Sequence, residues 1–344
     1  MEKVKAEKLL STALKKQVRV KEIRLIGSGY HSDGYKITTS DNKHYFIKQV
    51  KSHDLGFEFP GRKLSSLALS HSMNTRVKAF PRSIGVIAEN KELESIPEIT
   101  DDTVFYNIQE YGGDGKNYLQ IIEERKTRKH MGKDDIDELK QVVDFIVKIH
   151  KIKHPSKDKK QLNAVYNDYL RNVIGHQEYT LQLLHAFPKD APILSPKQQA
   201  DYMGLLLEQM HYWKDRSDRM TALHGDFWAA NAILSGKKIY FVDYSRMPWG
   251  DPAMDIGFWT SLYVFMWHNT KNDYYKELND KFLELYIDKT GDKEILKAIS
   301  YPFGLVGIMY VHPTWVPGIL PEVRKSFYEH VVAILKRKEF FWPK

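Results

Sequence analysis

The stretch Leu223-His-Gly-Asp-Phe-Trp-Ala-Ala-Asn-Ala-Ile-Leu234, followed by Lys238-Ile-Tyr-Phe-Val-Asp243, carries most of the fold prediction. Asp226 and Asn231 lie in a loop, and the two short apolar segments after them flank a polar turn, which predicts a β-hairpin. Such a hairpin brings Asp243 back beside Asp226 and Asn231. Hard oxygen ligands of this kind suit Mg²⁺ that is also bound to phosphate and water.

The spacing within this loop suits phosphoryl transfer. That reaction needs a group that orients the attacking hydroxyl and accepts its proton, and Asp226 stands shortly before the candidate metal ligand Asn231. Each side chain taken alone is equally typical of a turn, a cap or a strand end. Their order along the chain, with Asp243 after the hairpin, favours a phosphotransfer site.

His224-Gly-Asp226-x4-Asn231, Val242-Asp243 and Gly250-Asp-Pro-x-x-Asp255 closely resemble the signature of the aminoglycoside phosphotransferase and choline kinase superfamily, which shares the protein-kinase-like fold. The resemblance implies that Asp226 is the catalytic base and that Asn231 and Asp243 bind Mg²⁺. It also implies supporting, structural roles for His224, Gly250, Asp251, Pro252 and Asp255.

The N-terminal segments are consistent with this resemblance. It implies that Gly27, Ser28 and Gly29, between two predicted strands, form a glycine-rich phosphate loop and that Lys48, on the next strand, binds phosphate. Gly-Ser-Gly is also an ordinary hairpin turn. Glu58 is the only glutamate between Lys48 and Pro81, so it is the candidate acidic partner of Lys48. No Gly-x4-Gly-Lys-Ser/Thr sequence is present, which argues against a P-loop kinase.

Gln109-Glu110-Tyr111-Gly112 occupies the place of the kinase hinge. The resemblance implies that backbone groups of Glu110 and Gly112 bind the adenine edge. ATP is the expected phosphate donor, with GTP as the alternative, and Mg²⁺ is the expected metal. His150 ends a predicted helix on its apolar face, so a hydrogen-bonded core histidine is favoured over a catalytic one.

Strand and helix patterns divide the chain near the two glycines at 112 and 113. Residues 21–26, 34–38 and 44–48 are short, rich in β-branched and aromatic side chains, and typical of an antiparallel meander. Residues 104–109 indicate another strand, whereas residues 136–150 repeat apolar side chains at helical spacing. We therefore predict an α+β, bilobal, protein-kinase-like fold. Residues 1–110 form a small antiparallel β-sheet lobe that binds nucleotide, and residues 111–344 form a larger, mostly helical lobe for catalysis and acceptor binding.

Composition excludes several classes of protein. With 344 residues and 42% hydrophobic side chains the chain can bury a large core, and with no cysteine it has no disulfide, thiolate zinc site or cysteine nucleophile. The N-terminus lacks the apolar run of a signal peptide, residues 256–270 are too short to cross a bilayer as a helix, and four prolines interrupt residues 298–321. We expect a soluble, cytoplasmic protein without a membrane span.

The net charge of +8 permits anionic ligands without requiring nucleic acid. Basic clusters at 125–133 and 151–160 flank the predicted helix at 136–150, but no aromatic or glycine pattern of an RNA-binding module accompanies them. A solvated loop surface is therefore favoured, and no nucleic-acid partner is expected.

The expected acceptor is a hydroxyl of a small molecule, which the resemblance describes as aminoglycoside, choline-like or sugar-like. Several aromatic side chains are candidate walls for it, although a helix core is favoured for most of them: Trp249, Trp259, Trp267, Trp315, Trp342, Tyr263, Tyr301 and Tyr310. Asp273, Glu277, Asp280 and Glu284 could share a helix face suited to a polycation, or could simply be solvated. Residues 251–344 contain equal numbers of acidic and basic side chains, so they form no strongly acidic trough.

Two alternative functions keep the same fold. One is a protein kinase that acts on a macromolecular partner, but no Ala-Pro-Glu segment follows Asp243. The other is a nucleotide-binding regulatory module, which would have no need of the base Asp226. The sequence leaves the oligomeric state open.

Overall fold

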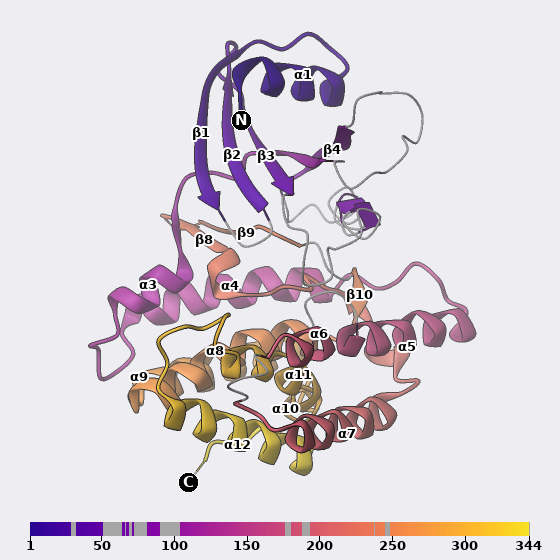
Figure 1. The fold of residues 1–344 in the computed structure, drawn as a ribbon, viewed down its shortest axis with the longest axis vertical. Helices are drawn as coiled ribbons and strands as arrows, with labels where there is room; N and C mark the ends of the chain where they lie inside the picture. Colours follow the sequence, from indigo (N-terminus) through magenta and orange to yellow (C-terminus); the bar gives the residue numbers. More distant parts are fainter. Residues whose placement is uncertain are drawn as a thin grey trace. The chain divides into compact units, whose positions relative to one another are not determined.

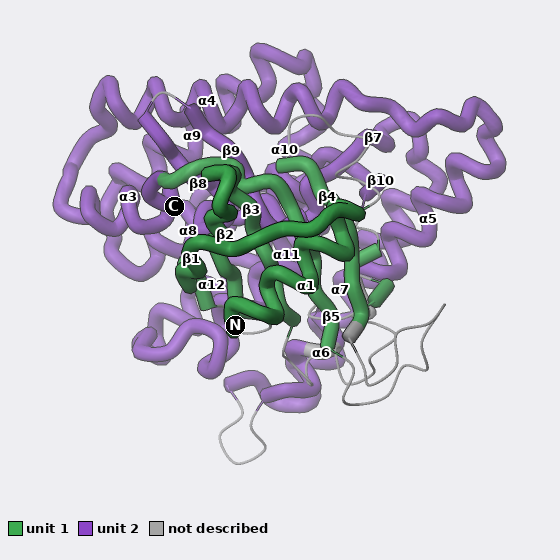
Figure 2. The backbone as a smooth tube through the Cα atoms, turned by 90° about the horizontal axis from the view of Figure 1, so that it is seen from above, with its two compact units in different colours: residues 1–114 green, residues 115–344 purple. Residues whose placement is uncertain are grey.

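A computed structural model describes residues 1–28, 32–50, 64–65, 67–68, 71, 81–89, 104–175, 180–187, 193–236, 238–244 and 248–343. The chain divides into two compact units, Met1–Asp114 and Gly115–Lys344 (Figures 1 and 2). The first unit is built on a β-sheet and the second is mostly helical, which confirms the predicted α+β fold class.

The first unit contains a five-stranded antiparallel sheet in the order β1-β2-β3-β5-β4. The predicted meander is its first three strands, and β5 is the predicted strand that ends at the glycine pair. Helix α1, which the sequence analysis did not predict, precedes the sheet. The elements are α1 (Lys3–Leu14), β1 (Val20–Ser28), β2 (Ser32–Thr39), β3 (His44–Val50), β4 (Ser83–Glu89) and β5 (Val104–Glu110).

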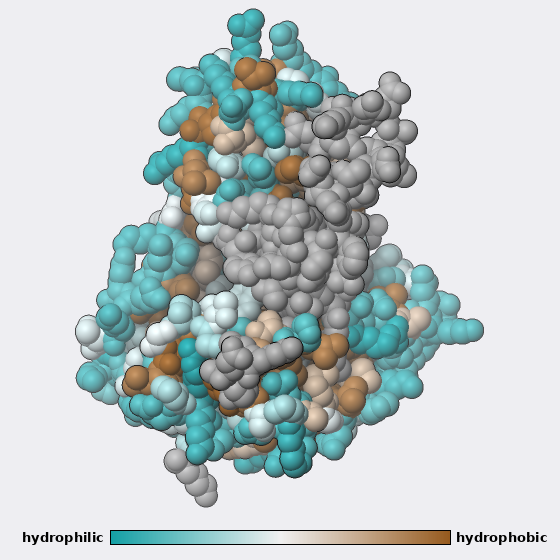
Figure 3. Space-filling view, viewed as in Figure 1, coloured by the Kyte–Doolittle hydropathy of each residue, from teal (hydrophilic) through white to brown (hydrophobic). Residues whose placement is uncertain are grey.

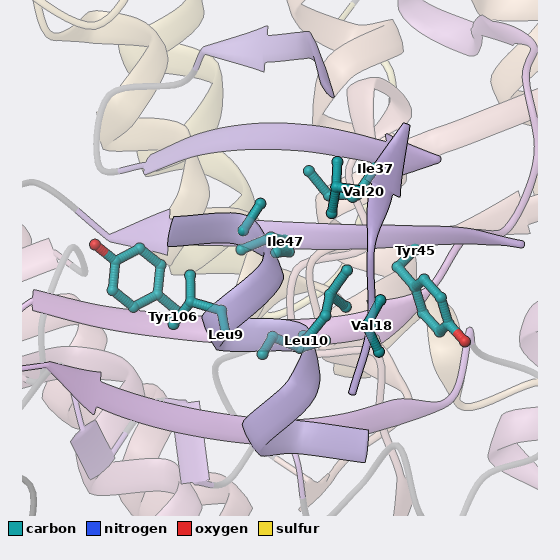
Figure 4. Close-up of a cluster of buried hydrophobic side chains, with 10 residues drawn as sticks. Leu9, Leu10, Val18, Val20, Ile37, Tyr45, Ile47 and Tyr106 are labelled. Carbon is teal, nitrogen blue, oxygen red and sulfur yellow. The ribbon is translucent and has the colours of Figure 1, made fainter. Parts of the chain in front are cut away.

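One face of this sheet packs against α1. Leu9 and Leu10 of the helix point toward alternate side chains of the strands, including Ile37 and Ile47, and all four side chains are buried (Figure 4). Because side chains alternate across a strand, Lys48 lies on the opposite face of the sheet. The buried apolar face therefore determines which way the predicted phosphate-binding lysine points.

The helices predicted from the sequence lie in the second unit. Residues 136–150 fall within one helix, α4, and residues 256–270 within another, α8. Its elements are β6 (Lys116–Asn117), α3 (Tyr118–Glu124), α4 (Lys133–His150), α5 (Lys159–Gly175), α6 (Thr180–His185), α7 (Pro196–Trp213), η1 (Ser217–Arg219), β7 (Thr221–Ala222), η2 (Ala229–Asn231), β8 (Ala232–Ser235), β9 (Lys238–Phe241), β10 (Trp249–Gly250), α8 (Ala253–Thr270), α9 (Tyr274–Thr290), α10 (Ile295–Ala298), α11 (Ser300–Val311) and α12 (Pro321–Arg337).

Helices α8 and α11 form the centre of the second unit and pack against each other, because both are apolar around most of their circumference. Pro302 lies in the first turn of α11, where a missing N–H is tolerated, and Pro321 begins α12. Within the described ranges, no helix is both long and apolar enough to span a bilayer. On the face shown in Figure 3 the described surface is mainly hydrophilic.

Both arginines of the basic cluster before α4 form ion pairs. Arg125 contacts Asp135 and Glu138 at 2.8 and 2.6 Å, and Arg128 contacts Asp134 and Asp135 at 2.8 and 2.9 Å. These contacts fix the segment to the first turns of α4, where negative side chains also stabilise the helix dipole. The structural use of both arginines weakens the nucleic-acid interpretation.

Candidate active site

The loop that carries Asp226 leaves a short strand and turns sharply at a glycine. β7 pairs with β10 in antiparallel fashion, and Gly225 takes a φ of +80°, which favours glycine because other residues meet steric strain there. After the loop, the predicted hairpin is present: β8 pairs with β9 and its turn contains Gly236. The elements therefore return the chain from Asn231 to Asp243 as the sequence predicted.

The carboxylate of Asp255 stabilises this loop through hydrogen bonds. It is fully buried at the start of α8 and accepts hydrogen bonds from the backbone N–H groups of His224 and Gly225, both at 2.8 Å. His150 Nε2 lies 3.1 Å from the same carboxylate, and its Nδ1 lies 2.9 Å from the hydroxyl of Tyr286. His150 is thus a hydrogen-bonded core histidine, and Asp255 braces the loop that precedes Asp226.

His224 links the two ends of the site. Its Nδ1 accepts a hydrogen bond from the backbone N–H of Asp226 at 3.2 Å, and its Nε2 lies 3.1 Å from the carbonyl oxygen of Val242. Burial lowers the pKa of His224, against the opposing charges of nearby aspartates that include Asp226 and Asp243. This pattern suits a neutral imidazole with its proton on Nε2, which positions the loop and does not transfer protons.

Asp226 and Asn231 lie in direct contact. The amide Nδ2 of Asn231 donates to the backbone oxygen of Asp226 at 3.0 Å and to its carboxylate Oδ2 at 3.2 Å. Because these bonds occupy Nδ2, the amide oxygen Oδ1 is the atom of Asn231 that faces away from Asp226. That oxygen is the kind of ligand that a magnesium ion would need.

Asp243 is the residue after Val242, whose backbone N–H donates to the carbonyl oxygen of Asn231 at 3.0 Å. This hydrogen bond joins the end of the hairpin to Asn231. Asp243 has a φ of +63°, an uncommon conformation for a residue other than glycine. Such strain recurs at functional sites, where the surrounding structure imposes it. Asn231 and Asp243 would supply two oxygen ligands, which fits a Mg²⁺ ion that completes its shell with phosphate and water.

Among the described residues no group of three or more His, Asp or Glu side chains forms a ready-made metal cage. A carboxamide and one carboxylate, as at Asn231 and Asp243, would leave the remaining positions around a Mg²⁺ ion to phosphate and water.

An aromatic cluster supports the underside of the loop. Phe227 stacks on Phe241 with ring centroids 4.5 Å apart, and Trp259 of α8 lies 5.0 Å from Phe227. Phe145 of α4 stacks on the other side of Phe241 at 4.5 Å. Phe227, Phe241 and Trp259 are fully or almost fully buried, so the residue after Asp226 anchors the loop in the core.

Asp251 belongs to a second buried network. Arg219 donates to both of its carboxylate oxygens, at 2.7 Å from Nε and 3.1 Å from Nη2, and Tyr166 contacts it at 3.0 Å. Arg219 also pairs with Asp292 and Glu294 near α10. Asp251 therefore fixes the segment that leads into α8, in keeping with the structural role that the resemblance implies.

Beside Asp226 and Asn231 lies a pocket of about 240 Å³. Its walls come from α6, α8, α11, the Asp226 loop and the segment after α11, which lie far apart in the sequence. The lining residues are Leu183, Asp226, Trp228, Asn231, Phe258, Leu305, Val306, Met309, Trp315 and Val316. Asp226 is the only ionisable side chain among these ten described residues.

In the first unit, the strand register aligns the glycine-rich segment with Lys48. Gly27 of β1 is paired with Gly34 of β2, Gly34 with Lys48 of β3, and Lys48 with Asn107 of β5. A Cβ added at Gly27 would meet nothing within 4 Å, so the backbone there is open to close approach. The position of Gly34 is different, because a Cβ added there would lie 2.8 Å from the ring of Phe46, so the open space lies at Gly27.

The predicted hinge begins with the last two residues of β5, Gln109 and Glu110. Glu110 and Gly112 are exposed, and Tyr111 between them donates from its hydroxyl to Asp114 at 2.6 Å. Lys36 of β2 pairs with the same carboxylate at 2.7 Å and lies over the Tyr111 ring. Ser28, at the end of β1, donates from its hydroxyl to the carboxylate of Asp33 in β2 at 2.7 Å.

Two residues of the sequence analysis, Gly29 and Glu58, lie outside the described residues. The predicted partner of Lys48 is among them.

Comparison with known proteins bears on this arrangement. A family model described as "Phosphotransferase enzyme family" matches residues 22–294, most of the chain. The chain belongs to the phosphotransferase enzyme family. This match spans the glycine-rich segment, Lys48, the Asp226 loop and Asp255, and confirms the family resemblance stated on the sequence. No curated protein matches the sequence.

Solved structures of phosphotransferases share the fold of this family member. Aminoglycoside phosphotransferase APH(4)-Ia has a TM-score of 0.53 at 13% identity, with 97% of this chain and 98% of that chain covered. Amicoumacin kinase, in complex with AMP-PNP, Ca²⁺ and its ligand Ami, has a TM-score of 0.53 at 11% identity, with 98% and 96% covered. A Plasmodium vivax ethanolamine kinase has a TM-score of 0.50 at 15% identity, with 92% and 81% covered. At these identities the likeness establishes the kinase-like fold.

The acidic side chains considered for a polycationic acceptor serve other contacts in this phosphotransferase. Glu277 lies 2.8 Å from His130, Asp273 and Asp280 accept from the indoles of Trp267 and Trp342, and Glu284 pairs with Lys281. None of these acidic residues lines the described pocket.

Of the tryptophans considered as walls, Trp315 alone lines the described pocket, and Trp259 is core. The sequence analysis missed Trp228, Leu305 and Met309. Their signal was present in the form of a large aromatic side chain within the motif loop and an apolar helix near the C-terminus. Which apolar residues face a pocket depends on the packing of α6, α8 and α11, which periodicity does not reveal.

Proposed function

We propose that this phosphotransferase is an ATP-dependent kinase that transfers the γ-phosphate to a hydroxyl of a small molecule. The observation that carries the proposal is the direct contact of Asp226 with Asn231 at the end of a pocket, on a loop braced by a fully buried carboxylate. A rigid base beside a cavity is what in-line transfer to a bound hydroxyl requires.

In this proposal Asp226 is the catalytic base. Its carboxylate lines the pocket, so an acceptor hydroxyl bound there can donate a hydrogen bond to it and lose its proton to it. The bonds from Asn231 Nδ2 and to His224 Nδ1 restrict the carboxylate and its backbone. The residue is positioned before the acceptor arrives, which removes part of the entropic cost of the reaction.

Asn231 Oδ1 and the Asp243 carboxylate would hold Mg²⁺. When bound, the ion neutralises charge on the nucleotide phosphates. Amicoumacin kinase, which shares the fold, is crystallised with AMP-PNP and Ca²⁺, and this supports the use of a nucleotide and a divalent cation here. The two residues themselves stay close because the Val242 to Asn231 backbone bond ties the hairpin to the loop.

The first unit would bind the nucleotide. Lys48 would neutralise phosphate charge, and Gly27, Ser28 and Gly29 would approach the phosphates with their backbone, in line with the open space at Gly27. Backbone groups of Glu110 and Gly112 would bind the adenine edge. ATP is the donor we favour, and GTP is the alternative that a donor comparison decides.

The test is a mass-spectrometric screen for phosphorylated products with MgATP and MgGTP over aminoglycosides, choline, ethanolamine, sugars and simple alcohols. The Asp226→Asn variant is compared with Asp288→Asn, the same change at an exposed position of α9. We expect product from the parent and Asp288→Asn, and a loss of roughly 10²- to 10⁴-fold for Asp226→Asn. Equal product from both variants would refute the assignment of the base.

A second measurement tests the metal ligands. Asp243→Ala is expected to abolish the Mg²⁺ dependence of nucleotide binding, measured by calorimetry with and without Mg²⁺. Intact nucleotide binding with no product from any acceptor would favour the alternatives, a nucleotide-binding regulatory module or a protein kinase.

A further inference from the structure

The pocket beside Asp226 has a chemical character that the phosphotransfer motif does not specify. Five of its lining side chains are aliphatic, namely Leu183, Leu305, Val306, Met309 and Val316, and three are aromatic, namely Trp228, Phe258 and Trp315. We propose that the pocket selects hydroxyl compounds with an apolar, uncharged body over polycationic and polyhydroxylated acceptors. This proposal rests on the proposed function of Asp226.

Charge is the first argument. A buried ammonium group loses several kcal/mol of hydration unless a carboxylate pairs with it. Within the described lining the only carboxylate is that of Asp226, which is needed to receive the acceptor hydroxyl. An acceptor with several ammonium groups would therefore find no further carboxylate partner within the described lining.

Hydrogen bonding is the second argument. The described lining side chains with polar atoms are Asp226, Asn231 and the two indoles of Trp228 and Trp315. The amide Nδ2 of Asn231 already donates to Asp226. A sugar-like acceptor would leave several hydroxyls without side-chain partners in the described lining, and a buried hydroxyl without a partner weakens binding. An alcohol with one hydroxyl near Asp226 loses nothing of this kind.

The apolar walls are held in place by their own contacts. Trp228 packs against Tyr310 of α11 with ring centroids 5.6 Å apart, and Tyr310 stacks on Phe265 of α8 at 4.4 Å. This stack ties the indole of the Asp226 loop to the two central helices. Trp228 therefore forms a fixed wall of the pocket next to the proposed base.

The segment that carries Trp315 is fixed by a buried arginine. Arg324 of α12 donates to the carbonyl oxygens of Tyr310, Val311, Val316 and Ile319. Its side chain thereby occupies the backbone acceptors at the end of α11 and in the following segment. Arg324 is a positioning residue for this wall.

The size of the pocket also bears on the acceptor. Its volume of about 240 Å³ lies below the roughly 300–1,000 Å³ typical of pockets for drug-sized ligands. It accommodates a compact acceptor or the hydroxyl-bearing end of a longer one. A series of short alcohols is therefore a suitable probe.

The test uses the full chain with MgATP and three matched sets of compounds: straight primary alcohols from four to eight carbons, the corresponding ω-amino alcohols, and polyols of equal carbon number. Phosphate esters are measured by mass spectrometry, and kcat and KM are determined for each. A buried methylene contributes about 0.8 kcal/mol, so kcat/KM is expected to rise about fourfold per carbon until the pocket is full. A terminal ammonium is expected to lower kcat/KM at least tenfold.

A pair of variants assigns the effect to the pocket. Met309→Glu introduces a carboxylate at a half-buried lining position, and Leu207→Glu makes a similar change at an exposed position of α7. Met309→Glu is expected to narrow or reverse the preference for alcohols over amino alcohols, and Leu207→Glu to leave it unchanged. Identical preferences in both variants would overturn the assignment.

Calorimetric binding of the same compounds separates this proposal from the proposed function. Alcohols that bind in the expected order but yield no phosphate ester would contradict the kinase function and leave the pocket assignment standing. Amino alcohols or polyols phosphorylated as well as the matched alcohols would overturn the pocket assignment and leave the kinase function standing. Failure of every alcohol to bind would also overturn it.

Discussion

Replacing Asp255 with asparagine is the most direct test of how the active-site loop is held. The carboxylate of Asp255 is fully buried and accepts the N–H groups of His224 and Gly225 at 2.8 Å, with His150 at 3.1 Å. Asparagine keeps one acceptor oxygen and turns the other into a donor, so at least one backbone N–H loses its partner. Hydrogen bonds to a charged group contribute about 1.5–3 kcal/mol each, and the variant loses one or two of them.

The expected loss of stability is therefore about 2–5 kcal/mol. At about 2 °C per kcal/mol for a chain of this size, the Tm of Asp255→Asn should fall by roughly 4–10 °C in calorimetry. Tyr286→Phe removes only the outer, neutral bond to His150 and should cost about 1 kcal/mol, while Asp288→Asn, at an exposed position, should change little.

Activity should fall along with stability in Asp255→Asn, because the same N–H groups orient the backbone that leads to Asp226. We expect phosphotransfer to drop at least tenfold at a temperature where the variant remains folded. A Tm for Asp255→Asn within 1 °C of the parent Tm would refute the idea that this carboxylate holds the loop in place. A decrease in Tm smaller than that of Tyr286→Phe would refute it as well.

Three further predictions concern other parts of the chain. Burial, together with the charges of the neighbouring His330 and Lys271, lowers the pKa of His268 to about 3. Below pH 6.5 the unfolded chain therefore binds a proton that the folded chain does not, so the free energy of unfolding should fall as the pH decreases. Between pH 7 and 4.5 this free energy should fall by about 2 kcal/mol less in His268→Gln than in the parent, and an equal pH dependence of the two melting curves would contradict this. Gly34→Ala should lower the Tm, since its Cβ would lie 2.8 Å from the ring of Phe46, whereas Gly27→Ala should leave the Tm unchanged and weaken MgATP binding; equal Tm values for the two would count against the packing argument. Arg324→Met should raise the acceptor KM without changing MgATP affinity, and an unchanged acceptor KM would remove its positioning role.

Local sequence patterns predicted most of the framework. The strands at 34–38, 44–48 and 104–109 and the helix ending at His150 were visible because their apolar side chains repeat at strand or helix spacing. Helix α1 was not predicted, although Ala6, Leu9 and Leu10 bury one of its faces. Its many charged residues obscure the apolar periodicity in the sequence. The packing of this helix on the sheet is evident only in the structure.

The geometry of the candidate site could be predicted because it is local. Asp226 and Asn231 share one loop, and a hairpin of only a few residues returns the chain to Asp243, so short-range turn chemistry determines their proximity. The brace formed by Asp255 and His150 joins residues 105 positions apart. Spacing along the chain carries no information about such a contact, and the sequence analysis therefore gave Asp255 a supporting role without naming its partners.

The proposed acceptor pocket is formed by residues that lie far apart in the sequence. Leu183, Met309 and Trp315 meet only because α6, α8 and α11 pack together, and no one of them stands out from other apolar residues in the sequence. The groups proposed for chemistry and those proposed for selection thus have separate origins. Asp226 and Asn231 are held by polar contacts within the motif, whereas most of the walls come from α6, α8, α11 and the segment after α11, with Trp228 of the Asp226 loop as the exception. Substitutions at Met309 should therefore change which acceptor is used without displacing the proposed base, which is why its kcat and KM effects are the informative pair to measure.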